Sequence, residues 1–364
     1  MKIKFLGRNK FLSSAKFLST ILGLLALALV VPFGLRGSAQ NYITGPVGHA
    51  PEAGNYKLSG PYTHDNLSVF LVHGKDRIVG KTFITLQEAL TQKKVIVYET
   101  RSVNELAIEN ISNDDIYVQS GEIVKGGQQD RALAIDMIVP PKSGKMPIAA
   151  FCVEHGRWSK RGTEQVTVFS SSAEVVSTRD LKLAAKSARS QGAVWQNVTV
   201  AQDKLSQNVG GRVNGAASES SLQLALENKA VQKNAVEYIK ALSGIVNGQD
   251  DVIGYAFAIN GKMNSADVYA SSGLFKKLWP KLLKGSAIEA IAEFRKNARF
   301  APVQKDAVKS FLGDSETGKA AEKSEDLTKR IQLVTRESDA NIFFETRDRA
   351  QKEVWVHRNY IKKD

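Results

Sequence analysis

The order of apolar patterns along the chain constrains its fold more than any other feature of the sequence. Between residues 66 and 153, short apolar or β-branched runs alternate with turn-forming clusters such as Pro140–Gly144, which is typical of β-strands. These runs lie at residues 66–72, 94–99, 105–110, 115–119, 132–139 and 146–153. They predict an antiparallel sheet, as a sandwich or partial barrel, over about residues 65–170.

A helical section follows the predicted strands. Apolar residues recur at intervals of three to five over residues 218–246, which predicts one long helix that stops at Gly248. A second helical pattern covers residues 274–298, with interruptions expected at Pro280 and Gly285. Shorter helices are predicted at residues 178–190, at residues 194–207 and after the capping box Thr85–Glu88.

The C-terminal part of the chain returns to β patterns. Asn260-Gly261 separates two alternating runs and predicts a tight hairpin, because a type I′ turn needs two positive φ angles. Further β-like runs lie at residues 329–336, 341–346 and 353–358. We therefore predict the α+β class, with one domain over residues 65–358 whose last strands join the first sheet.

Two segments outside these patterns are predicted to lack regular structure. Residues 40–64 are rich in Gly and Pro and indicate a linker. Residues 313–326 are polar and charged, and indicate an exposed loop. Within that loop Gly313–Lys319 matches the first seven positions of a phosphate-binding P-loop, but the eighth is Ala320, where Mg²⁺ coordination needs a hydroxyl. We interpret this match as chance composition.

The first 39 residues have the order of a secretory signal peptide. Five cations up to Lys16 precede an apolar run over residues 21–31, and Gly37-Ser38-Ala39 places small residues at the cleavage positions before Gln40. The alternative is an uncleaved membrane anchor, because residues 17–35 carry no charge. Both interpretations predict an exported protein, periplasmic or secreted, and only the anchor predicts a membrane contact.

Composition excludes several classes of protein. With 43% hydrophobic residues, 9 prolines and 28 glycines, neither wholesale disorder nor a collagen-like repeat is expected. A single cysteine excludes an intramolecular disulfide and any Cys-rich metal site, and we predict no metal and no cofactor. Six cations of the +13 balance lie in the acid-free residues 1–39, so the excess of positive charge on the rest of the chain is mild. The chain also has no Lys/Arg run interleaved with aromatic residues, and no nucleic-acid partner is therefore expected.

The most informative polar segment is Gly121-Glu-Ile-Val-Lys-Gly-Gly-Gln-Gln-Asp-Arg131. Its paired glycines allow a close backbone approach to a ligand or a tight turn. Gln128, Gln129 and Arg131 then supply hydrogen-bonding groups, and the Arg131 fork can hold a phosphate or carboxylate. The structural alternative is a bulge or hairpin turn in which Arg131 forms a salt bridge.

A second polar cluster, Phe151-Cys-Val-Glu-His-Gly-Arg-Trp158, ends an apolar strand. Arg157 beside Trp158 offers an anion-binding fork next to a planar surface for a base or sugar, or else a packing pair within the fold. Cys152 could be a thiolate nucleophile, although a Cys in such a run is more often buried and inert. Glu122 and Glu154 are the candidate general bases.

These two clusters resemble the ADP-ribosylglycohydrolase- and rhodanese-phosphatase-associated protein domain family. The stretch Gly254-Tyr-Ala-Phe-Ala-Ile-Asn-Gly261, followed by Asp267-Val-Tyr and Leu274–Leu283, is similar to the C-terminal half of the same family. The resemblance covers about residues 65–300. It implies, by association, a part in the metabolism of NAD-derived nucleotides. Asp130 stands where the family pattern leads us to expect Asn, and His155 where Gln is common.

Two hypotheses follow. In the first, the protein binds or processes a nucleotide or ribose-phosphate ligand, held by Gln128, Gln129, Arg131, Arg157 and Trp158. In the second, it is a non-catalytic envelope protein in which Glu122, Glu154, Arg131 and Arg157 form a buried ion-pair network that braces the sheet. Side-chain exposure and the presence of a shared pocket distinguish the two. A third hypothesis, an enzyme with a Cys152 nucleophile, requires a reactive thiol.

Overall fold

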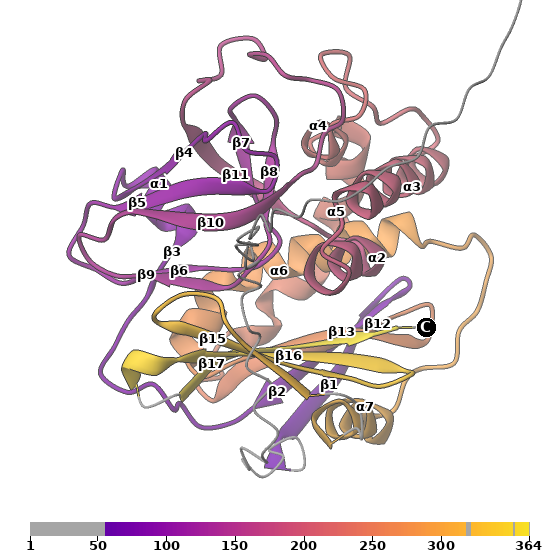
Figure 1. The fold of residues 1–364 in the computed structure, drawn as a ribbon. Helices are drawn as coiled ribbons and strands as arrows, with labels where there is room; N and C mark the ends of the chain where they lie inside the picture. Colours follow the sequence, from indigo (N-terminus) through magenta and orange to yellow (C-terminus); the bar gives the residue numbers. More distant parts are fainter. Residues whose placement is uncertain (1–54, 318–321, 352–353, 364) are drawn as a thin grey trace, which may run out of the picture. The chain divides into compact units, whose positions relative to one another are not determined.

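Three mostly antiparallel sheets and the helices that pack against them make up the structure (Figure 1). This computed structural model describes residues 55–317, 322–351 and 354–363. The predicted signal peptide or anchor at residues 1–39 lies outside the described residues. The predicted α+β class is confirmed, and one sheet curves into a half-barrel, as the predicted partial barrel requires.

The largest sheet brings the two ends of the described chain together. Its strands lie in the order β1-β2-β12-β13-β17-β16-β15-β14, and all neighbours are antiparallel. The bounds are β1 Lys57–His64, β2 Leu67–His73, β12 Val252–Ile259, β13 Lys262–Tyr269, β14 Glu322–Asp326, β15 Ile331–Glu337, β16 Asn341–Asp348 and β17 Val354–Lys362. The predicted return of the C-terminal strands to the sheet of the first strands is thus confirmed.

The two smaller sheets come from the middle of the predicted β region. The six-stranded sheet has the order β11-β7-β8-β10-β5-β4, and the three-stranded sheet has the order β3-β6-β9, in which β3 and β6 are parallel. The bounds are β3 Ile84–Thr85, β4 Val95–Tyr98, β5 Glu105–Asn110, β6 Ile116–Val118, β7 Glu122–Gly126, β8 Arg131–Leu133, β9 Met137–Val139, β10 Gly144–Cys152 and β11 Phe169–Val175. The predicted single sheet is therefore divided, and it includes β7 and β11, which lie outside the predicted strand runs.

The helices lie mostly in the second half of the chain. Their bounds are α1 Leu86–Thr91, α2 Arg179–Lys182, α3 Gln191–Val209, α4 Leu222–Leu226, α5 Lys229–Leu242, α6 Ser272–Ala292 and α7 Lys305–Thr317, with short turns η2 Leu183–Ser187, η3 Ser243–Val246 and η4 Arg349–Gln351. The capping box predicted at Thr85 is present at the start of α1. None of the helices in the described residues is both long and apolar enough to cross a membrane.

Two helix predictions need correction. The single helix predicted over residues 218–246 is divided, because α4 ends at Leu226 and the side chain of Asn228 caps the start of α5. Helix α6 runs without a break through Pro280 and Gly285. Proline inside a helix costs about 3 kcal/mol, and the burial of most of the other residues of α6 offsets that loss.

The segments predicted to be a linker and a loop also contain regular structure. Residues 57–64 form β1, an edge strand, with a register shift at Gly60 and Pro61. Proline is tolerated at an edge or a bulge, so its presence did not exclude a strand. In the predicted loop at 313–326, residues up to Thr317 belong to α7 and residues 322–326 form β14. Gly313, where the P-loop match begins, lies within α7, so this part of the match does not form a phosphate-binding loop.

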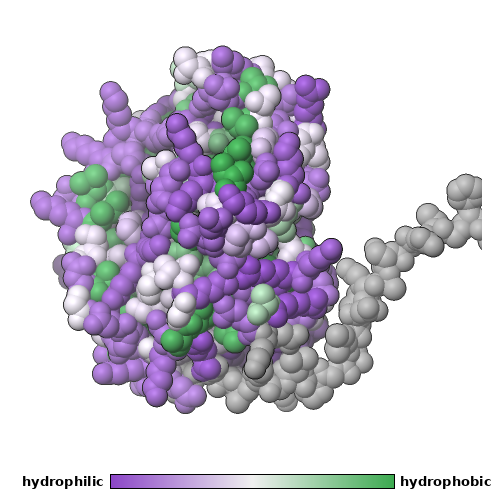
Figure 2. Space-filling model, turned by 90° about the vertical axis from the view of Figure 1, so that its left-hand side faces the viewer, coloured by the Kyte–Doolittle hydropathy of each residue, from purple (hydrophilic) through white to green (hydrophobic). Residues whose placement is uncertain are grey.

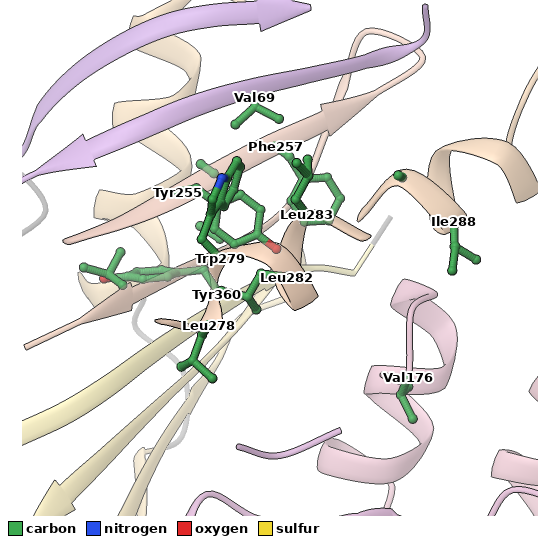
Figure 3. Close-up of a cluster of buried hydrophobic side chains, with 14 of the residues drawn as sticks. Val69, Val176, Tyr255, Phe257, Leu278, Trp279, Leu282, Leu283, Ile288 and Tyr360 are labelled. Carbon is green, nitrogen blue, oxygen red and sulfur yellow. The ribbon is translucent and has the colours of Figure 1, made fainter. Parts of the chain in front are cut away.

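Helix α6 joins the layers of the fold. It contacts β12 and β13 of the large sheet and β11 of the six-stranded sheet. Trp279 of α6 meets the ring of Tyr255 edge-on, with 5.4 Å between ring centroids (Figure 3). At Gly285, a Cβ atom would lie 2.8 Å from Cγ2 of Val175, so glycine allows the helix to approach β11. The apolar core accordingly extends along both sides of α6.

The large sheet is covered on both faces. Along β17, alternate side chains point to opposite sides. Tyr360 packs against Phe311 of α7, whereas His357 and Asn359 face α2 and η2 on the other side. The face shown in Figure 2 is mostly hydrophilic, and its apolar residues form small separate groups.

The hairpin between β12 and β13 gives a test of the fold. Asn260 and Gly261 have φ angles of 53° and 71°, as predicted, and a Cβ at Gly261 would lie 2.7 Å from the backbone oxygen of Ala301. We expect Gly261→Ala to lower the free energy of unfolding by about 2–4 kcal/mol. Gly248 has φ 70° with open space around it, so Gly248→Ala should cost only about 1 kcal/mol. Equal losses in urea denaturation would contradict this account.

Candidate functional site

The glycine pair of the first polar cluster lies where β7 ends and the turn to β8 begins. A Cβ at Gly127 would lie 2.4 Å from Cζ of Phe169, so glycine is needed for close packing. Gln129 and Asp130, which follow, are completely buried. The turn therefore directs its polar side chains into the protein and not toward solvent.

Four of the buried side chains form what we call the motif network: Asp130, Glu154, Arg157 and Arg161. Arg161 donates to both oxygens of Asp130 at 2.7 and 2.9 Å, and the Nε of Arg157 donates to Glu154 at 2.7 Å. The backbone N–H of Asp130 donates to the second oxygen of Glu154 at 3.2 Å. Each carboxylate is thus neutralised by an arginine, and the two pairs are linked.

The pKa values of the two carboxyls differ because their partners differ. Burial raises the pKa of Asp130 despite the hydrogen bonds from Arg161. Burial acts on Glu154 in the same direction, but hydrogen bonds from Arg157 and Ser218 bring its pKa below the ordinary value. Glu154 is therefore ionised and fully engaged, and it is a poor general base.

Arg131 is also directed toward the interior. It is completely buried, its NH1 donates to the backbone and side-chain oxygens of Gln129 at 3.3 Å, and its NH2 lies 3.5 Å from Glu99. Glu99 in turn accepts the backbone N–H of Gln128 at 3.1 Å. The side chains of Arg131 and Arg157 thus lie around the same turn, and each faces a carboxylate of the chain itself.

Of the remaining predicted residues, Glu122 lies apart from this network, whereas Cys152 and Trp158 lie beside it without joining its ion pairs. Glu122 accepts a hydrogen bond from Lys281 of α6 at 2.8 Å, in a different part of the interior. Cys152 is buried, and burial raises the pKa of its thiol to about 11, so the thiolate that a nucleophile requires is scarce at neutral pH. Trp158 is 48% exposed, whereas Arg157 beside it points inward. Sequence spacing did not reveal Arg161 and Glu99, which complete the ion pairs.

Another polar cluster, which the sequence analysis did not predict, surrounds His357 of β17. Its Nδ1 lies 2.9 Å from Asp136, and its Nε2 lies 3.0 Å from Asp267 of β13. All three side chains are buried. Since a ring nitrogen donates to a carboxylate only when it carries a proton, contacts at both nitrogens favour the charged imidazolium. We call this arrangement the His357 clamp.

Lys186, which follows α2, completes the charge balance of the clamp. Lys186 donates to Asn359 at 3.3 Å and lies 3.8 Å from Asp136. It belongs to η2, a π-helical turn, which is rare and often marks functional sites. Burial lowers the pKa of His357, but the charges of Asp136 and Asp267 more than reverse this effect, so the pKa lies above its ordinary value.

Two cavities lie on either side of an ion pair next to the clamp. The first has a volume of about 50 Å³ and is lined by Lys182, Lys186, Tyr255, Asp267 and His357, among others. The second, which we call the Glu289 hollow, has about 300 Å³ and is lined by Arg179, Asn264, Glu289 and Arg295, among others. Nζ of Lys182 lies 3.6 Å from Oε2 of Glu289, so this pair separates the two spaces.

Glu289 of α6 is the most distinctive group of the hollow. Its Oε1 accepts the backbone N–H of Arg179 at 2.6 Å and Nδ2 of Asn264 at 2.9 Å. Its Oε2 is buried and accepts no hydrogen bond from the described residues. Burial raises the pKa of Glu289 although Lys182 acts in the opposite direction. Among the described residues, no group of three or more His, Cys, Asp or Glu side chains is placed to hold a metal ion.

A family model for the ARG and Rhodanese-Phosphatase-superfamily-associated Protein domain matches residues 55–361. The chain belongs to this family. The match confirms the resemblance seen in the sequence and extends it over nearly all of the described residues. No curated protein and no solved structure matches the chain.

The buried ion pairs of the motif network should contribute measurably to the free energy of unfolding. Arg157→Ala would leave the buried carboxylate of Glu154 without its main partner, so the free energy of unfolding should fall by about 3–5 kcal/mol. Arg212→Ala is the matched control, because its ion pair with Glu219 is 66% and 70% exposed and should contribute less than about 1 kcal/mol. A loss below about 1 kcal/mol for Arg157→Ala, measured by urea denaturation, would show that the network does not brace the fold.

The His357 clamp predicts a dependence of stability on pH. Because the folded-state pKa of His357 is raised, the clamp stabilises fully below the unfolded-state pKa of about 6.5 and loses its contribution as pH rises through the folded-state pKa. The difference in free energy of unfolding between the wild type and His357→Gln should therefore shrink from pH 6 upward. Urea denaturation of both proteins at a series of pH values measures this difference. A difference independent of pH would contradict the charged clamp.

Proposed function

We propose that this protein binds, and acts on, a ribose-phosphate ligand of the ADP-ribose or NAD-derived nucleotide type in the Glu289 hollow. One observation carries the proposal: the buried residue Glu289, whose Oε2 accepts no hydrogen bond from the described residues, lines a cavity together with the cationic residues Arg179, Lys262 and Arg295. A ligand that presents hydroxyl groups at one end and a phosphate at the other matches both features.

The dimensions and charges of the hollow support this ligand class. A volume of about 300 Å³ is at the lower end of small-molecule sites and suits a ribose phosphate more than a complete dinucleotide. Lys262 and Arg295 are exposed and free to follow a phosphate, whereas Glu289 and Asn264 are buried and fixed. Burial also raises the pKa of Glu289 above its ordinary value, which is the direction that suits a general acid.

The proposed site differs from the one predicted at the sequence motifs. Arg131 and Arg157 were expected to hold phosphate, but they contact Glu99 and Glu154. Binding a ligand there would require those buried pairs to open, at a cost of several kcal/mol. The Glu289 hollow is already a cavity of about 300 Å³, and its lining cations Lys262 and Arg295 are exposed. The name of the family, which records an association with ADP-ribosylglycohydrolase, supports the ligand class but not its position.

A second candidate is a non-catalytic protein of the cell envelope. The observation in its favour is the motif network, whose arginines are buried and paired as a structural role requires. For both candidates we propose that the protein is exported, on the basis of the cationic and apolar order of residues 1–39.

A ligand titration tests the proposal. Purified protein should gain thermal stability with ADP-ribose or ribose 5-phosphate, by about 2.7 kcal/mol when the ligand is present at 100 times its Kd. Arg179→Ala should lose most of the gain, because a lining cation is removed. Arg157→Ala should be less stable but should keep the gain, since that residue lies in the motif network. No saturable gain at millimolar ligand would favour the envelope protein, and a gain lost only in Arg157→Ala would place the ligand at the motif.

A further inference from the structure

We infer that residues 295–300, which we call the cationic rim, form a subsite for a second phosphate beside the Glu289 hollow. The site then takes a pyrophosphate-linked ligand in preference to a sugar monophosphate. This inference rests on the proposed function and specifies the ligand that the site accepts. It depends on where the fold holds the rim and on which charges of the rim lack a partner.

The hairpin between β12 and β13 holds the cationic rim from both ends. Just before the rim, the backbone oxygen of Glu293 accepts a hydrogen bond from Nδ2 of Asn260 at 2.7 Å. At the far end, a Cβ added at Gly261 would lie 3.1 Å from Cβ of Phe300, so the two segments are in close contact. Asn260 and Lys262 of the same hairpin line the hollow. The rim therefore runs along the edge of the hollow.

A tight turn gives the rim a defined shape. The backbone N–H of Ala298 donates to the oxygen of Arg295 at 3.2 Å, and Asn297 between them has a φ angle of 63°. Asn is one of the residue types most often found in this left-handed conformation. Arg295 lines the hollow, Lys296 lies within the turn and Arg299 directly follows it. All residues from Arg295 to Arg299 are exposed, so the cations face solvent beside the hollow.

The rim and the hollow carry positive charges that the protein does not neutralise. Four exposed cations form no ion pair with any described residue: Lys262, Arg295, Lys296 and Arg299. The neighbouring carboxylates that line the hollow are already engaged, since Glu293 pairs with Lys204 at 2.5 Å and Asp180 lies 3.6 Å from Arg179. The rim itself contains no acidic residue. A ligand is thus the available source of counter-charge.

One phosphate group cannot contact all four cations. A ribose phosphate in the hollow places its phosphate near Lys262 and Arg295, because both of these residues line the cavity. Lys296 and Arg299 do not line it and lie farther along the rim. A second phosphate, bonded to the first through a shared oxygen, would lie next to it and outside the hollow. Arginine and lysine are the side chains that hold phosphate oxygens in such positions.

The size of the hollow leads to the same arrangement. Its volume of about 300 Å³ suits a ribose phosphate, so the remainder of a larger ligand must leave the cavity and lie on the surface beside it. Contacts between exposed charges each change affinity by about 2- to 5-fold. With two such contacts, we expect ADP-ribose to bind about 5- to 25-fold more tightly than ribose 5-phosphate.

Calorimetric titration with ADP-ribose and ribose 5-phosphate tests the inference. The double variant Lys296→Gln, Arg299→Gln should bring the affinity ratio of the two ligands close to one by weakening ADP-ribose alone, with ribose 5-phosphate unchanged. Lys329→Gln is the matched control, because Lys329 is also exposed and without an ion pair to any described residue, but lies between β14 and β15. Its ratio should remain that of the wild type. Thermal unfolding verifies that each variant is folded.

The possible results separate this inference from the function on which it rests. Equal affinity of the wild type for both ligands overturns the subsite and leaves the proposed function in place. Binding of neither ligand removes the subsite and the proposed function together. A ratio that stays high in the double variant shows that other residues bind the second phosphate. Equal weakening of both ligands shows that the rim acts only through its general charge, and either result overturns the assignment.

Discussion

The charge contact between His357 and two buried carboxylates is the interaction on which the arrangement of the site depends. Asp136 immediately precedes β9 of the three-stranded sheet, whereas Asp267 and His357 belong to the large sheet. The imidazolium therefore ties two sheets together by neutralising a buried carboxylate of each. Lys186 of η2 joins the same cluster and so fixes the preceding helix α2, which supplies Arg179 and Lys182 beside α6.

The motif network shows how a segment that has the composition of a binding site can serve the fold. Its glycines, amides and arginines are the residue types that hold phosphate, and the family resemblance rests partly on them. In the structure, the paired glycines permit close packing, and the arginines neutralise Asp130 and Glu154. Asp130 departs from the amide expected at that position, and its negative charge is what Arg161 binds with two hydrogen bonds.

Local patterns predicted much of the fold but little of the site. Asn260-Gly261 determined a hairpin because a two-residue turn depends on its own φ angles. The break predicted in α6 was wrong, because tertiary burial outweighs the cost of Pro280 in the helix. The linker predicted at β1 was wrong because an edge strand accepts Pro61. The Glu289 hollow could not be predicted, since its partners come from α2, β13 and α6, and no spacing in the sequence records which buried carboxylate a distant lysine will approach.

The central claim is that ligand chemistry belongs to the Glu289 hollow and that the motif network is structural. Backbone amide hydrogen exchange, measured with and without ribose 5-phosphate, tests it most directly because each amide reports its own position. We expect the ligand to slow exchange at residues 178–182, where the N–H of Arg179 holds Glu289, and at residues 289–295. Slowed exchange at residues 126–131 and around Arg157, with no change at Arg179, would contradict the account.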